Sequence, residues 1–221
     1  SLSSVHAFAE RIGDVDVLIN NAGVLGLEES RSADGFELQL ATNFLGHFAL
    51  TNLLLPAISD RVVVVGSQAH RQAELDLDNL QLEGGAYAPY RAYANSKLAG
   101  MLMMLELDRR LREVQSAVRV VGGHPGYTAT KLMRTTSNPV FNVLASVGNT
   151  FVGMKPEEGA RCVLAAATWD VPGNTYIGPG WPGELRGAPK PVGRSREASD
   201  LQLAADLWIR AAGLTGAVWP R

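Results

Sequence analysis

The stretch RVVVVG, residues 61–66, decides the fold class of this 221-residue chain. Four consecutive valines place apolar side chains on both faces of a strand, which is typical of a strand buried in a parallel sheet. Further strand and helix patterns alternate along the chain, with strands expected at 14–20, 118–123 and 174–178 and helices at 4–12, 32–55, 90–114, 157–168 and 197–212. This alternation predicts an α/β fold with a Rossmann-like, doubly wound parallel sheet and helices on both faces.

Composition and charge exclude several classes of function. The net charge of −2 gives no reason to expect nucleic acid or an anionic membrane as a partner. The single cysteine, Cys162, cannot form an internal disulfide, and its helix-like surroundings favour a buried structural thiol. No apolar stretch approaches the ~20 residues of a membrane span, and the first residues lack the pattern of a secretory signal. We therefore predict one cytoplasmic domain over residues 1–221, without a membrane span.

Small or polar residues follow three of the expected strands. These segments are NNAG (20–23), GSQAH (66–70) and HPGYT (124–128). The carboxyl ends of parallel strands meet at one edge of the sheet, and ligands of such folds bind at that edge. The sequence therefore predicts a ligand site where these three segments come together.

A tyrosine and a lysine stand four residues apart in YANSK, residues 93–97. On a helix this spacing puts Tyr93 and Lys97 on one face. A cation ~4 Å from the phenol, at an effective dielectric near 20, is worth roughly 4 kcal/mol, which predicts a pKa lowered by about 3 units. The phenol would then act as a general acid or base near neutral pH. Ser67, after the 61–66 strand, would hold the same substrate oxygen.

Together these motifs resemble those of the short-chain dehydrogenase/reductase family. NNAG resembles the family's segment after its fourth strand, and Asn43 in NFLG resembles the helix asparagine of the catalytic tetrad. Ser67, Tyr93 and Lys97 match the other three members of that tetrad. The resemblance covers nearly the whole chain, and ATNFLGHFALTNLLLP, SQAH and YANSKLAGMLMMLEL are similar to the retinol-dehydrogenase-like branch.

The resemblance implies an NAD(P)-dependent oxidoreductase that interconverts an alcohol and a ketone or aldehyde on a small, apolar substrate. It implies NAD or NADP as cofactor and a homo-dimer or tetramer formed through the two long helices. Tyr93 would be the general acid or base, Lys97 would bind the nicotinamide ribose, and Asn43 would hold a relay water. The implied cofactor-binding set is Asn20, Asn21, Ala22, Gly23, Tyr93, Lys97, Pro125, Gly126, Thr128 and Thr130.

Several side chains keep a second interpretation. Asn43 could instead cap or kink its helix, and Asn20 and Asn21 could join loops to the sheet. The histidines His47, His70 and His124 are expected to be structural, and no set has the spacing of metal ligands, so no metal site is predicted. The apolar stretch 127–154 could cover the substrate or pack on the core.

One family feature has no counterpart in these residues. The family's first strand, Gly-rich turn and nucleotide-selecting residue would all precede Ser1, so we expect an N-terminally incomplete sheet that lacks the first strands. The strand at 14–20 would then expose an apolar edge. Either the chain is a fragment of a complete enzyme, or it is a truncated, non-catalytic binding or assembly module of the same ancestry. In both cases we expect little turnover from these 221 residues alone.

Overall fold

The computed structural model describes residues 1–126 and 156–219. Its sheet has the order β1 (Val15–Asn20), β2 (Ile58–Val65), β3 (Arg119–Gly123), β4 (Tyr176–Pro179) and β5 (Pro189–Pro191). The first four strands pair in parallel, and β5 pairs antiparallel with β4. The predicted α/β class is confirmed. The antiparallel edge strand β5 was not predicted, because prolines in a segment fit only an edge strand and give no strand signal.

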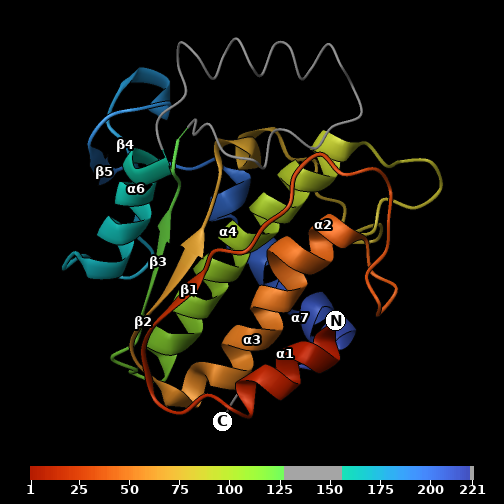
Figure 1. The fold of residues 1–221 in the computed structure, drawn as a ribbon, viewed down its shortest axis with the longest axis horizontal. Helices are drawn as coiled ribbons and strands as arrows, with labels where there is room; N and C mark the ends of the chain where they lie inside the picture. The colour runs from red at the N-terminus through yellow and green to blue at the C-terminus, as the bar shows by residue number, and fades with distance from the viewer. Residues whose placement is uncertain (127–155, 220–221) are drawn as a thin grey trace.

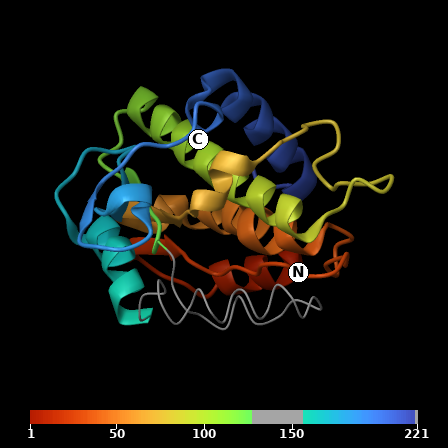
Figure 2. The ribbon, with the colours of Figure 1, turned by 90° about the horizontal axis from the view of Figure 1, so that it is seen from above.

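Helices cover both faces of the sheet (Figures 1 and 2). On one side lie α1 (Leu2–Ala9), α3 (Gly46–Leu54), α4 (Pro89–Glu113) and α7 (Leu201–Thr215); on the other lies α6 (Pro156–Thr168). The larger core packs α4 against β2 and α7, with Phe48, Met101 and Trp208 buried in it. The smaller core lies under α6 and contains Cys162, which is buried as expected.

The helix expected at 32–55 starts later than its sequence pattern suggests. Arg31 and Glu37 form an isolated bridge, and the helical run begins with α2 (Leu38–Leu40). The Glu37 carboxylate caps it by accepting hydrogen bonds from the backbone N–H groups of Gln39 and Leu40, at 2.8 and 2.6 Å. A carboxylate that satisfies the first free N–H groups fixes the start of a helix. A π-helical turn (Ala41–Leu45) then leads into α3.

Strand β1 forms one border of the sheet. Within the described residues no strand pairs with its outer edge, and Ile19 is 40% exposed. The apolar edge expected for residues 14–20 is therefore present. Over residues 1–126 and 156–219, no helix combines the length and apolar character that crossing a membrane requires.

Candidate active site

Three parallel strands end side by side and bring their following residues to one edge of the sheet. Asn20 pairs with Val64, and Val65 pairs with Gly123. The backbone N–H of Gly66 continues this ladder to the carbonyl of Gly123 at 2.9 Å. The segments after β1, β2 and β3 consequently meet at the carboxyl edge, as the sequence predicts.

Tyr93 lies in the second turn of α4 and is 8% exposed. Burial raises the pKa of its phenol, and the hydrogen bond with the Ser67 side chain opposes that effect. The expectation of a lowered pKa is wrong for this structure, because burial disfavours the charged phenolate more than any neighbouring group favours it. Tyr93 is therefore a protonated phenol at neutral pH, and it lies beside the Ser67 side chain.

Lys97 lies one turn further along α4, with its Nζ 5.8 Å from the centroid of the Tyr93 ring. The ammonium donates a hydrogen bond of 2.9 Å to the carbonyl of Val65 and is 7% exposed. No carboxylate pairs with it within the described residues. Burial lowers the pKa of Lys97 to about 8, so the site holds a partly desolvated cation whose charge is easily lost.

Asn43 lies in the π-helical turn and fastens the segment after β1. Its Oδ1 accepts from the Val24 N–H at 2.8 Å, and its Nδ2 donates to the Val24 carbonyl at 2.9 Å and to Ser96 Oγ at 2.8 Å. These bonds use both amide hydrogens, so the side chain positions residues 23–24. The π-helical turn agrees with the alternative that Asn43 marks a distortion of its helix, a feature common at functional sites.

Asn20 takes the structural role that the sequence left open. Its Nδ2 donates to Thr51 Oγ1 at 2.8 Å, and this bond joins β1 to α3. Its buried Oδ1 has no partner within the described residues. Asn21 and Ala22 are exposed at the sheet edge, where they can contact a ligand.

The loop after β3 is described only in part. Pro125 and Gly126 are half-buried, and Gly126 has a φ of +72°, a conformation that glycine adopts without strain. Thr128 and Thr130 lie outside the described residues, and so does the apolar stretch 127–154.

The three histidines singled out in the sequence contact backbone or acidic groups. His70 Nδ1 lies 2.5 Å from the Ser67 carbonyl, and His124 Nε2 lies 2.9 Å from Glu184 Oε2. For His47, burial and the charge of Lys97 lower the pKa to about 4, so its ring is neutral. Within the described residues no three His, Cys, Asp or Glu side chains gather as metal ligands.

The residues at this edge leave space and hydrogen-bond donors for a ligand that carries hydroxyl groups. A Cβ added to Gly23 would lie 3.3 Å from Asn43 Oδ1 and 3.7 Å from Lys97 Nζ, so only a bare backbone leaves that space open. An ammonium has three donors, and within the described residues Lys97 uses one of them on protein, at the Val65 carbonyl. Hydroxyl groups of a sugar are suitable acceptors for the others.

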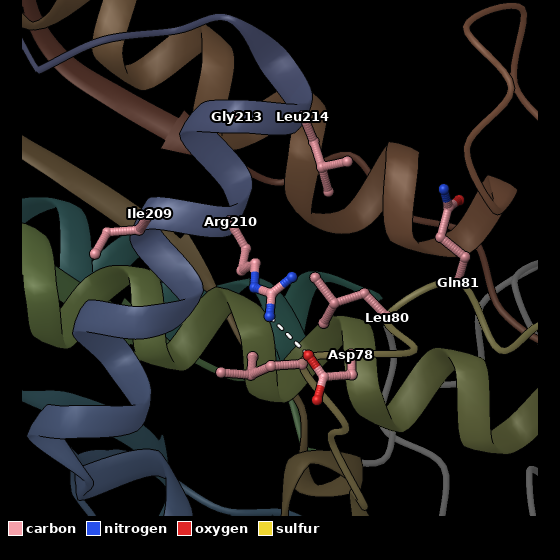
Figure 3. Close-up of a pocket in the computed structure, with 8 residues that line it drawn as sticks. Asp78, Leu80, Gln81, Ile209, Arg210, Gly213 and Leu214 are labelled. Carbon is pink, nitrogen blue, oxygen red and sulfur yellow. Dashed lines mark hydrogen bonds and ion pairs between the residues drawn. The ribbon is translucent and has the colours of Figure 1, made fainter.

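A separate groove of about 350 Å³ lies between α7 and the loop that contains Leu77–Gln81 (Figure 3). Leu80, Ile209 and Leu214 contribute to its lining, and an ion pair of 2.7 Å joins Asp78 to Arg210. None of the predicted site residues lines it. The groove is therefore distinct from the Tyr93 site.

Residues 3–140 match the sequence profile described as short chain dehydrogenase. The chain belongs to the short-chain dehydrogenase/reductase family. It is 36% identical to human retinol dehydrogenase 13 and 38% identical to mouse polyprenol dehydrogenase, in each case over 98% of this chain and 66% of the relative. These matches support the retinol-dehydrogenase-like branch. The chain spans about two thirds of the length of these relatives.

Solved structures share the fold. A crystal structure described as an uncharacterized protein from Mycobacterium Paratuberculosis superposes with a TM-score of 0.85, at 42% identity, over 100% of this chain and 74% of the other. An alcohol dehydrogenase from Thermococcus sibiricus complexed with 5-hydroxy-NADP superposes with a TM-score of 0.50 at 22% identity, over 78% of this chain and 68% of the other, and shows the fold alone.

Sequence reasoning missed two residues that hold the site. Ser96 accepts a hydrogen bond from Asn43. Its position inside the YANSK motif is the sequence feature that could have indicated this role. Glu184 lies in a Pro/Gly-rich segment without periodicity, and no sequence pattern indicates that its carboxylate reaches the residues beside Ser67.

Proposed function

We propose that this chain carries the catalytic site of an NAD(P)-dependent oxidoreductase that interconverts an alcohol and a ketone or aldehyde. The observation that carries the proposal is the arrangement of three groups: the Tyr93 phenol beside the Ser67 side chain, with the Lys97 ammonium over the Tyr93 ring. Family membership and relatives named as dehydrogenases support the same reaction class.

In the reduction direction, Tyr93 is the proton donor. A nicotinamide cofactor, if held by Lys97 and the backbone at Gly23, would supply the hydride that the carbonyl carbon receives. Tyr93 gives its phenolic proton to the carbonyl oxygen, so an alcohol forms and a phenolate remains. The raised pKa of Tyr93 keeps the phenol protonated before the reaction, which suits the acid role. Ser67 donates a hydrogen bond to the same oxygen and orients it.

Lys97 and Asn43 support this proton transfer. The Lys97 ammonium stabilises the phenolate through its charge and can bind ribose hydroxyls with its remaining donors. A pKa of about 8 lets Lys97 release and regain a proton near neutral pH. Asn43 holds the backbone at Gly23 and Val24, which forms the adjacent wall of the site. We also propose that Pro125, Gly126, Thr128 and Thr130 contact the cofactor.

The branch suggests a lipophilic substrate, because its relatives are named retinol and polyprenol dehydrogenases. The choice between NAD and NADP, the cytoplasmic location and a homo-dimer or tetramer stay predictions.

Calorimetry with NADH and NADPH tests the proposal on the chain as it stands. We expect saturable binding of at least one nucleotide, followed by its slow oxidation when decanal or all-trans-retinal is added. Absence of binding of either nucleotide to well-folded protein would reject the proposal for this chain and favour the non-catalytic module. Lys97→Met provides the control. It removes the ammonium that faces Gly23, so nucleotide binding should weaken in this variant.

A further inference from the structure

We propose that Glu184 is a positioning residue for Ser67, acting by fastening the turn that Ser67 begins. The inference rests on the proposed function, since it assigns Glu184 an effect on the reaction that passes through the Ser67 hydroxyl.

The Glu184 carboxylate joins the ends of three neighbouring strands. Its Oε2 accepts from Gln68 Nε2 at 2.5 Å and lies 2.9 Å from His124 Nε2. Its Oε1 lies 3.3 Å from the Arg71 guanidinium. Gln68 and Arg71 follow β2, His124 follows β3, and Glu184 itself follows β4. One side chain therefore holds these segments at the edge where Tyr93 and Ser67 meet.

The turn that begins at Ser67 has few bonds of its own. It is a 3-10 helix of five residues (Gln68–Gln72), capped by a 3.2 Å bond from the Ala69 N–H to Ser67 Oγ. Such short helices have poor hydrogen-bond geometry and depend on their surroundings. The Ser67 hydroxyl keeps its place only if something outside the turn holds it.

Part of that outside support comes from α4, where Ala69 packs beside Tyr93 and Ala94, and part comes from the segment that contains Glu184. Besides the carboxylate bonds, Arg71 donates to the Gly193 carbonyl at 2.6 Å, and the Ser195 N–H donates to His70 Nε2 at 3.2 Å. His70 in turn contacts the Ser67 carbonyl through Nδ1. The turn is thus held by residues 184–195, with Glu184 contributing bonds from both carboxylate oxygens.

The backbone at Glu184 is unusual. Its φ is +54°, in the left-handed region that residues other than glycine seldom adopt, and it directly follows Gly183 at +74°. Such a conformation persists where the surroundings determine it strongly, and it is found preferentially at functional sites. The carboxylate is 20% exposed and has fixed partners, so its direction is set by the cluster.

The consequence for the reaction concerns the distance between two hydroxyls. The Ser67 side chain lies beside Tyr93, and both groups must reach the same substrate oxygen. A displacement of about 1 Å at a reacting group can cost 10²-fold in rate. Loss of the Glu184 bonds would loosen the turn and misplace Ser67, while Lys97 and Asn43, on other helices, keep their contacts.

The experiment compares Glu184→Ala and Glu184→Gln with the exposed control Glu197→Ala. Hydrogen–deuterium exchange is followed in the peptide 66–73, and decanal reduction is measured with the nucleotide that binds. We expect at least tenfold faster exchange in that peptide and a 10- to 100-fold lower kcat/KM in Glu184→Ala. Nucleotide affinity should stay within twofold, and Glu184→Gln, which keeps an acceptor oxygen, should recover most of the loss. Glu197→Ala should match the wild type.

The outcomes separate the two proposals. If the wild-type chain shows no turnover, the proposed function fails, and the role assigned to Glu184 fails with it whatever the exchange shows. If the wild type turns over but Glu184→Ala leaves exchange and kcat/KM unchanged, only the present inference fails. An equal loss of nucleotide affinity and of kcat/KM would also overturn it, because that indicates general disruption. Should Glu184→Ala not fold, Gln68→Ala breaks the same contact from the other side.

Discussion

The Lys97 ammonium lies over the ring of Tyr93, 5.8 Å from its centroid, yet its hydrogen bond goes to the carbonyl of Val65. The two residues share a helix face, and burial shifts the pKa of each toward its uncharged form, although Lys97, with a pKa of about 8, still carries its charge at pH 7. The consequence is a site that stores a neutral phenol beside a cation at a cost to stability.

Lys97→Met should stabilise the nucleotide-free chain at pH 7. The pKa of Lys97 falls from 10.5 to about 8 on folding, and a shift of that size corresponds to about 3 kcal/mol. Loss of the bond to Val65 offsets about 1 kcal/mol of this. We expect the free energy of unfolding in urea to rise by about 1–2 kcal/mol, with nucleotide binding weakened at least tenfold.

The same variant has a predicted pH signature. Because the folded-state pKa of Lys97 lies below its unfolded value, the penalty is complete below about pH 8. It disappears as the pH rises from 8 to 10.5, where the unfolded chain binds more protons. The difference between Lys97→Met and wild type should shrink over that window. A variant less stable than wild type at pH 7 would contradict this account of Lys97.

Gly23→Ala should damage the site more than the fold. The added Cβ would lie 3.3 Å from Asn43 Oδ1 and 3.7 Å from Lys97 Nζ, in the space assigned to the nucleotide. We expect at least a tenfold loss of nucleotide affinity by calorimetry, with less than about 1 kcal/mol lost in stability. Gly13→Ala is the control, because nothing lies within 4 Å of its added Cβ. Equal affinities in the two variants would contradict the assigned position of the ribose.

Much of this architecture follows from the sequence because periodicity reports burial. The valines of β2 and the long apolar face of α4 were predicted closely. The start of the helical run at Leu38 was not predicted, because a capping carboxylate at Glu37 interrupts an otherwise helical pattern. The spacing of Tyr93 and Lys97 predicted that both side chains lie on one face of the helix. It could not predict how deeply they are buried, and this burial sets both pKa values. Glu184 was missed because its contacts join segments about 60 to 116 positions apart.

Tyr176→Phe should preserve or raise stability. The Tyr176 hydroxyl is buried without a partner in the described residues, and its ring packs between His70 and His124. Removing an unsatisfied buried hydroxyl relieves a desolvation cost of about 1–3 kcal/mol. Thermal unfolding should therefore show an equal or higher Tm. A clear fall in Tm would mean that the hydroxyl has a hydrogen-bond partner after all.

Arg61→Met should destabilise the fold by about 2–4 kcal/mol, because it removes the side-chain donor to the Ala166 carbonyl and one of two donors to the Trp169 carbonyl, at the end of α6. Arg61 is 4% exposed and donates to the carbonyls of Ala166 and Trp169, at 3.1 and 2.8 Å. The exposed Arg11→Met should change the free energy of unfolding by less than about 0.5 kcal/mol. Urea unfolding of both variants checks this, and similar values for the two would refute the anchoring role of Arg61.

The most direct test of the central claim is the turnover of Tyr93→Phe compared with Tyr90→Phe, each with the nucleotide that binds and decanal. Tyr90 lies one turn earlier on α4, with its ring 6.5 Å from that of Tyr93, so it controls for loss of a phenol nearby. If Tyr93 donates the proton, Tyr93→Phe should bind nucleotide within threefold of wild type and lose at least 10³-fold in kcat, while Tyr90→Phe stays within threefold. Retention of wild-type kcat by Tyr93→Phe would contradict the assignment of Tyr93 as the proton donor.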